Sequence, residues 1–212
     1  SPQIININVN SSPNLPSLAT TSICNHENYY LSINSLPIYP NTTYSWTVTA
    51  NNVIGATAGS GQGNFVINQQ LSLLFPDFSG SVTYHITPSL NGCNGTTVNY
   101  TVIVNPIPNT GISGEISVSE ASTTPIDLFS IISGEEPDGN WSRLDGTGGT
   151  FDAVVGIFTP EVGATNSTFT YELTNSNTGC YSSTLAIINI DVIPVGLSNT
   201  TNQTISNNGF SD

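Results

Sequence analysis

Positive charge is almost absent from this sequence. Its 212 residues include no lysine and one arginine, Arg143, against 14 acidic residues, so the formal net charge is −13. A chain with a single cation cannot neutralise the phosphates of a nucleic acid, and it offers no basic surface to anionic lipids. The composition therefore argues against nucleic-acid binding and against direct docking on a membrane.

Long apolar runs and a leader segment are also missing. No run approaches the 18 or so apolar residues of a membrane span, so direct membrane insertion is not expected. The start, Ser1-Pro2-Gln3, lacks the charged and apolar regions of a signal peptide. We therefore expect that a signal was removed or that the chain is a fragment of a longer protein.

Helical periodicity is absent as well, and alternation with a period of two takes its place. Apolar and polar residues alternate over 44–50, 82–86 and 169–174. Such alternation is typical of strands with one face in a core and one in water. The inward positions predicted for the three strands are Tyr44, Trp46, Val48 and Ala50, then Val82, Tyr84 and Ile86, then Phe169, Tyr171 and Leu173. Short strands between Gly, Pro, Asn and Ser clusters predict an all-β sandwich.

An internal repeat sets the predicted domain boundaries. SVTYHITPSLNGC (81–93) and TFTYELTNSNTGC (168–180) share their pattern, and the cysteine stands nine positions after the tyrosine in both. A strand ending near proline follows each cysteine, and a third copy of that ending stands at 4–13. The predicted parts are the last strand or linker of a preceding repeat (1–12), two full repeats (13–106 and 107–194) and a linker (195–212).

Several motifs resemble repeats of Bacteroidota surface proteins. Residues 13–106 are similar to their PKD-like domains through SIC (22–24), SWTVTA (45–50) and TPSLNGCNGTTVNYTVIVNP (87–106). Residues 107–194 resemble a sister immunoglobulin-like (Ig-like) repeat through GNWSR (139–143), GTGGTFDAVVGIFTP (146–160) and FTYELTNSNTGC (169–180). The fold expected is thus two tandem Ig-like (PKD-like) β-sandwich domains.

The end of the chain carries a further resemblance. ISNNGFSD (205–212) is similar to the entry of the gliding-motility-associated C-terminal sorting domain. The resemblance implies export by type IX secretion and display at the cell surface, often as an adhesin. The implied partners are the secretion and anchoring machinery, reached through the adjoining sorting domain, and surface glycans or proteins.

Three cysteines allow one bridge within the chain. Cys24 and Cys93 belong to one repeat, and the export implied by the resemblance permits disulfides, so a Cys24–Cys93 bridge at one end of the first sandwich is predicted. The alternative is two free, buried thiols. By the pattern of the sister repeats, Ser119 occupies the place of a partner for Cys180, which leaves Cys180 as a free thiol or a site for an intermolecular crosslink.

An acidic stretch in the second repeat is the one candidate metal site. Closely spaced carboxylates supply the oxygens that calcium prefers, and glycine after two of them fits a turning loop. The spacing matches no EF-hand, so a solvated acidic loop is the alternative. The predicted ligands are Glu135, Glu136, Asp138, Asp145 and Asp152.

Catalytic motifs are missing from the sequence. It has two histidines: His26 lies in a predicted turn, and His85 lies opposite Tyr84, facing water. No G-x-S-x-G elbow marks a nucleophile, and no catalytic residue is predicted. Trp46 and Trp141 fall in corresponding strands, and Trp46, which shares a face with Tyr44 and Val48, is expected in the core rather than on a ligand platform.

Three functions fit these features. The first is a non-enzymatic structural and adhesive segment, a stalk in a repeat array near its C-terminal sorting domain. The second is a carbohydrate- or protein-binding accessory module of a secreted enzyme, which aromatics grouped on one exposed face would favour. The third is a spacer that presents the sorting domain.

Overall fold

The computed structural model describes residue 3 and residues 12–33 and 40–191. Within them the chain is built from β-strands, with one short 3-10 helix, η1 (Leu128–Ser130). None of the helices in this part is long and apolar enough to span a membrane. The predicted all-β class is confirmed. The strand predicted at the start and the predicted linker at 195–212 lie almost entirely outside the described residues.

The chain forms two compact units, and neither is one continuous segment. Unit 1 comprises residues 1–111, 134–140 and 171–184, and unit 2 comprises residues 112–133, 141–170 and 185–212. A hairpin of the second repeat thus has its turn in unit 1 and the far halves of its strands in unit 2. The boundaries at residues 106 and 194 remain sequence predictions.

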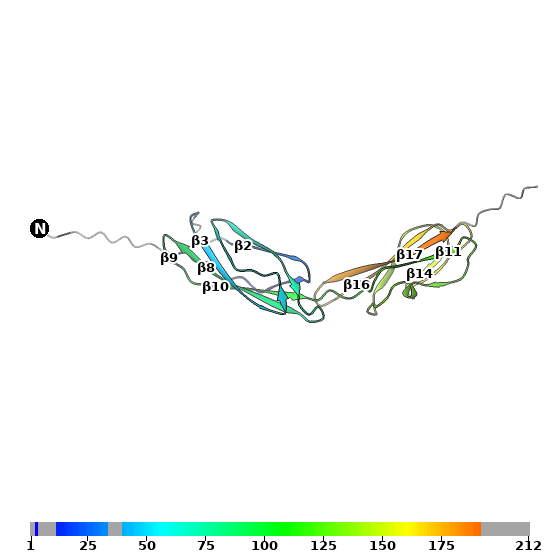
Figure 1. The fold of residues 1–212 in the computed structure, drawn as a ribbon, viewed down its shortest axis with the longest axis horizontal. Helices are drawn as coiled ribbons and strands as arrows, with labels where there is room; N and C mark the ends of the chain where they lie inside the picture. Colours follow the sequence, from blue (N-terminus) through cyan, green and yellow to red (C-terminus); the bar gives the residue numbers. More distant parts are fainter. Residues whose placement is uncertain (1–2, 4–11, 34–39, 192–212) are drawn as a thin grey trace, which may run out of the picture. The chain divides into compact units, whose positions relative to one another are not determined.

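The strands of unit 1 form one large sheet and two small ones (Figure 1). The large sheet has the order β1-β10-β8-β3-β5, with β9 paired to β8; β2 pairs with β6, and β4 with β7. The first strand is parallel to the last, whereas β10, β8 and β3 are antiparallel. The bounds are β1 Thr21–Cys24, β2 Asn28–Ile33, β3 Thr43–Asn51, β4 Val53–Ile54, β5 Gly59–Gln62, β6 Phe65–Gln70, β7 Ser72–Leu73, β8 Gly80–Leu90, β9 Cys93–Asn94 and β10 Val98–Asn105.

Alternating apolar residues from these sheets fill the core of unit 1. The inward residues predicted for β8, Val82, Tyr84 and Ile86, are fully buried, and Tyr29 of β2 stacks on Tyr84 with ring centroids 5.8 Å apart. Trp46 is buried and donates its indole N–H to the Thr57 carbonyl at 3.0 Å, so its predicted place in the core is confirmed. Ala50 is exposed instead; β5 pairs with β3 only over Thr43–Trp46, so Ala50 lies on a part of β3 at the edge of the sheet.

Unit 2 and the strands that enter it repeat this order. One sheet has the order β11-β17-β16-β13 and the other β12-β15-β14, and β11 is again parallel to the last strand. Phe169 lies between Phe151 and Phe158, with ring centroids 4.8 and 5.0 Å away. The bounds are β11 Gly114–Ser119, β12 Ile126–Asp127, β13 Asn140–Asp145, β14 Thr150–Asp152, β15 Ile157–Thr159, β16 Ser167–Thr174 and β17 Tyr181–Asp191.

Candidate functional site

A disulfide joins Cys24 to Cys180, two cysteines from different sequence repeats. Their Cα atoms are 5.6 Å apart, and their sequence separation is 156. The predicted Cys24–Cys93 bridge is therefore wrong, and so is the prediction that Cys180 lacks a partner within the chain. Cys93 is the free cysteine and is half-buried.

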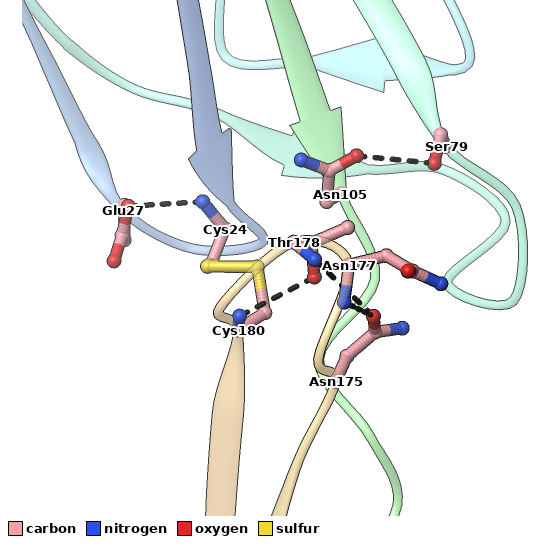
Figure 2. Close-up of a disulfide and its surroundings, with 8 residues drawn as sticks. All are labelled: Cys24, Glu27, Ser79, Asn105, Asn175, Asn177, Thr178 and Cys180. Atoms are coloured by element: carbon pink, nitrogen blue, oxygen red, sulfur yellow. Dashed lines mark hydrogen bonds between the residues drawn. A yellow bond between two sulfur atoms is a disulfide. The ribbon is translucent and has the colours of Figure 1, made fainter.

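Short turns on both sides hold the two bonded cysteines (Figure 2). Cys24 ends β1, and its N–H donates to the Glu27 carboxylate at 2.9 Å. On the other side the Asn175 side chain accepts from the N–H of Asn177 at 3.0 Å, and the Cys180 N–H donates to the Thr178 hydroxyl. Because hydrogen bonds close both turns, the sulfur atoms are presented from fixed backbone.

Cys93 lies in a hairpin at a different place in unit 1. Asn91 and Gly92 form a two-residue turn in which both have positive φ, 50° and 81°. This turn is the tight type preferred by Asn-Gly, and it pairs Cys93 with Leu90 across the hairpin. The pairing places Cys93 at the end of β8, whereas Cys24 pairs with Asn105 at the end of β10.

The residues that follow β10 are hydrogen-bonded to later parts of unit 1. The Asn109 carbonyl accepts from the Glu136 N–H at 2.8 Å, and the Asn109 side chain donates to the Gly134 carbonyl at 2.6 Å. Thr110 is buried, and its hydroxyl lies 3.0 Å from that of Ser182. These hydrogen bonds hold residues 109 and 110, at the start of the second repeat, against later residues of the same repeat.

A shallow cleft of about 730 Å³ lies beside this joint. Its lining is mostly polar and comprises Asn25, His26, Asp77, Glu136, Asn175 and Ser182, among others. His26 Nδ1 is 2.9 Å from the Ser72 hydroxyl. A serine–histidine pair resembles part of a hydrolytic triad, but the triad also needs a carboxylate on the second ring nitrogen and an oxyanion hole, and no hydrogen bond of the described residues supplies them here.

The five predicted calcium ligands do not come together. Glu135, Glu136 and Asp138 lie in unit 1, whereas Asp145 and Asp152 lie in unit 2. In the part of the chain that the structure describes, no three His, Cys, Asp or Glu side chains are placed to hold one metal ion. The Asp145 and Asp152 carboxylates instead accept backbone N–H groups of their own turns, from Gly146 at 2.7 Å and Val154 at 3.0 Å. The calcium site remains a prediction from the sequence.

His85 belongs to a ladder of polar side chains on the outer face of the large sheet. It lies opposite the buried Tyr84, as predicted, and its ring bridges the Thr49 hydroxyl at 2.9 Å and the Asn99 side-chain oxygen at 2.8 Å. Thr83 and Thr101 make a similar cross-strand pair at 3.0 Å. Repeated pairs of this kind stabilise neighbouring strands, so the ladder has a structural role.

Arg143 is held inside unit 2 by polar and aromatic groups. Its guanidinium donates to the Gly148 carbonyl at 2.9 Å and to the Ser167 hydroxyl at 2.7 Å. The same group lies over the rings of Phe158 and Phe169. The only basic side chain of the protein is thus engaged in packing and is not offered to a ligand.

An aromatic turn (residues 74–79) projects from unit 1. Its exposed side chains include Leu74, Phe75 and Phe78, the last two 62% and 70% exposed. Asn52 fixes the turn, because its side-chain amide donates to the carbonyls of Phe75 and Phe78 and its side-chain oxygen accepts from the Phe75 N–H. Sequence reasoning missed this turn, since neither ring lies in a strand pattern.

Comparisons with solved structures give neighbours among tandem Ig-like and cadherin domains. Extracellular domains 1–4 of protocadherin gamma B7 are 13% identical with a TM-score of 0.31, over 86% of this chain and 51% of theirs. The titin fragment I67–I69 is 9% identical with a TM-score of 0.31, over 87% and 67%. The Bacteroides ovatus glucan-locus protein SGBP-B is 15% identical with a TM-score of 0.32, over 84% and 48%. This chain spans about half the length of the protocadherin fragment and of SGBP-B.

The family comparison is specific to the first repeat. No curated protein matches the chain. The model of the PKD-like domain family matches residues 21–108, from β1 to just past β10. A PKD-like domain is typically a non-catalytic module. Residues 21–108 are therefore similar to the PKD-like domain family, and they lie within an all-β fold.

Proposed function

We propose that this chain is a non-enzymatic structural and adhesive segment of a large secreted surface protein. It acts as a stalk in an array of repeats close to a C-terminal type IX sorting domain. That sorting domain is its link to the secretion and anchoring machinery. The observation that carries the proposal is the disulfide between Cys24 and Cys180, which ties one repeat covalently to the next.

The arrangement around the disulfide supports a mechanical role. A linker alone would let successive repeats move freely. Here the Cys24–Cys180 bond restrains them in addition to the backbone, and Asn109 and Thr110 at the start of the second repeat are hydrogen-bonded to residues 134–136 and to Ser182. Force applied to the two ends of the chain would thus be carried by the Cys24–Cys180 disulfide. The polypeptide between the two cysteines could not extend until that bond broke.

Surface chemistry supports a location outside the cell. Disulfides persist in oxidising compartments and are rare in the cytosol. Arg143, the only residue that trypsin could recognise, is half-buried in β13. An acidic, lysine-free surface resists proteases that require a basic residue.

Force spectroscopy on the full chain tests the stalk function. When the oxidised chain is pulled by its ends, the polypeptide between Cys24 and Cys180 should stay hidden. Reduction should add roughly 500 Å of contour length, because each extended residue spans about 3.3–3.6 Å. Cys93→Ser is the matched control and should leave the oxidised trace unchanged. Extension of the oxidised chain to its full length without a force peak would contradict the proposal.

The aromatic turn favours a second candidate function, an accessory module that binds glycans. Flat rings stack on sugar rings, and a fixed turn presents Phe75 and Phe78 without an ordering cost. Affinity electrophoresis in gels containing soluble β-glucans or xylans tests this function. Phe75→Ala with Phe78→Ala should abolish any retardation. Tyr30→Ala is the matched control, since Tyr30 is 62% exposed but lies on β2. No retardation of the unmodified chain in any gel would remove this candidate.

A further inference from the structure

Cys24 and Ser119 occupy the same position in their repeats. Each is the last residue of the first strand, and each pairs in parallel with the last strand of its repeat, Cys24 with Asn105 and Ser119 with Asp191. The sheets agree around them, because β1-β10-β8-β3 corresponds to β11-β17-β16-β13. We call this position, at the end of the first strand, the donor position.

Cys93 and Cys180 also occupy one position. Each follows a glycine with positive φ, Gly92 at 81° and Gly179 at 75°, in the turn between the last two long strands of its repeat. Each stands nine residues after the buried tyrosine of the preceding strand, Tyr84 or Tyr171. We call this position the acceptor position.

The disulfide therefore joins the donor position of one repeat to the acceptor position of the next. Cys180 of the second repeat bonds Cys24 of the first. The rule applies equally to Cys93, the acceptor of the first repeat, whose donor would belong to the repeat before it. Cys93 is half-buried and free, as an acceptor without its donor must be.

We propose that Cys93 forms a disulfide with a cysteine that a preceding repeat of the same protein carries at the position of Cys24. The proposal rests on the proposed function in one respect, namely that the array continues before this chain. It also accounts for Ser119, since a serine at the donor position ends the series of disulfides at the second repeat. Two of the three cysteines, Cys24 and Cys180, then form one disulfide between repeats, and the third, Cys93, is one partner of another.

Formation of this bond is an oxidation of two thiols. The Cys93 thiolate attacks a mixed disulfide on the donor cysteine, or the reverse, and the S–S bond forms as the other sulfur leaves. Two electrons and two protons pass from the cysteine pair to the oxidant. The oxidant is a low-molecular-weight or protein disulfide, which is reduced to two thiols.

A duplicated chain tests the proposal without the natural upstream sequence. A second copy of residues 11–105 is placed directly before residue 11, so that the new joint reads Val-Asn-Ser-Ser, as the sequence does at 9–12. The interval from Asn10 to Cys24 equals that from Asn105 to Ser119, so the new joint has the natural length. The protein is oxidised with glutathione disulfide, capped with N-ethylmaleimide and digested with pepsin at low pH, where thiolate exchange is suppressed.

The expected result is a single free thiol among the five cysteines, that of the copied Cys93. Peptide mapping should link the copied Cys24 to Cys93 and retain the Cys24–Cys180 bond. That retained bond shows that the rest of the chain has folded. Three free thiols alongside an intact Cys24–Cys180 bond would overturn the proposal. Two further controls distinguish a specific bond from chance oxidation, which needs no fixed joint. In one, a flexible Gly-Ser segment of ten residues lengthens the new joint, and in the other the copied domain is supplied as a separate chain. Formation of the same link at equal yield in either control would also overturn the proposal.

Cys93→Ser in the duplicated chain is the control. It should leave two free thiols, both in the added copy, and should not disturb the Cys24–Cys180 bond. Loss of the stalk behaviour in force measurements would not affect this result, because disulfide pairing is measured here without load. The two proposals can therefore fail separately.

Discussion

The guanidinium of Arg143 lies 5.0 Å from the centre of the Phe158 ring. The centre of the Phe169 ring lies 5.6 Å from the same guanidinium. Two guanidinium nitrogens of Arg143 donate hydrogen bonds to the Gly148 carbonyl and the Ser167 hydroxyl. Charge-assisted hydrogen bonds and cation–π contacts are each among the stronger polar interactions in proteins. The one arginine of the protein thus stabilises the packing of unit 2.

Replacement of Arg143 should destabilise unit 2. We expect Arg143→Met to cost about 2–3 kcal/mol, because it leaves the Gly148 carbonyl and Ser167 hydroxyl without this donor. Arg143→Lys should lower the free energy of unfolding by less, since lysine keeps the positive charge but lacks the several N–H donors of the guanidinium group. Urea unfolding followed by Trp141 fluorescence in a Trp46→Phe background measures unit 2. Trp141→Phe gives the matched report on unit 1, where a comparable loss would contradict the assignment.

Arg143 also predicts resistance to trypsin. The residue lies in β13 with its side chain engaged. Native chain should therefore stay uncut between Arg143 and Leu144 under conditions that cleave the urea-unfolded chain. Arg143→Lys should be cut faster than the unmodified protein, and gel electrophoresis under reducing conditions detects both. Equal native cleavage rates for the two proteins would show that the side-chain contacts do not protect the site.

The disulfide predicts the thiol content and part of the stability. Thiol titration of the unfolded, unreduced chain should find one thiol, and pepsin mapping should assign it to Cys93. Cys180→Ser should lower the free energy of unfolding by up to about 5 kcal/mol, because it opens a very long loop in the unfolded state. Cys93→Ser should change stability by less than about 1 kcal/mol. A bridge that includes Cys93 in this chain would contradict the structure.

Tyr171 should anchor residues 134–140. Its buried hydroxyl accepts from the Gly139 N–H and donates to the Glu136 carbonyl, both at 2.8 Å. Tyr171→Phe leaves these two backbone groups without that partner and should cost about 1–3 kcal/mol. Hydrogen exchange should then accelerate at Gly139. Tyr181→Phe, at an exposed tyrosine in the next strand, should leave the exchange rate unchanged.

Unit 1 should lose stability in alkali. Burial, and the nearby Tyr29, raise the pKa of Tyr84 to about 12 from its ordinary value of 10.0, and burial raises the pKa values of Tyr29 and Tyr100 as well. The unfolded chain therefore loses these protons first, so the contribution is complete below about pH 10 and is lost as the pH rises toward 12. The urea midpoint reported by Trp46 should fall over that range. Tyr84→Phe should flatten the fall, and a midpoint independent of pH would refute the prediction.

The fold was largely predictable because apolar and polar residues alternate along its strands. Val82, Tyr84 and Ile86 form a row that only a strand with one buried face can place in a core. The Tyr-to-Cys interval identified two equivalent repeats. Helical periodicity is absent from the sequence, and the structure forms strands β6 and β7 over residues 65–70 and 72–73.

The candidate site was less predictable because it depends on contacts between repeats. Cys24 and Cys93 share a repeat, and that favoured their pairing. Sequence proximity says nothing about which end of a sandwich a residue occupies, and Cys24 ends a strand that runs parallel to β10 whereas Cys93 follows the antiparallel β8. Sequence spacing also says nothing about whether the five acidic side chains converge, and among the described residues no three His, Cys, Asp or Glu side chains are placed to hold one metal ion.

The bond between Cys24 and Cys180 has a consequence for damage to the protein. It closes the polypeptide between them into a covalent ring of more than 150 residues. A single cut within that ring leaves both fragments joined, so nothing is shed until a second cut or a reductant acts. In an array that is linked in this way throughout, the segments where one cut would sever the protein are those outside every ring, which here include residues 195–212.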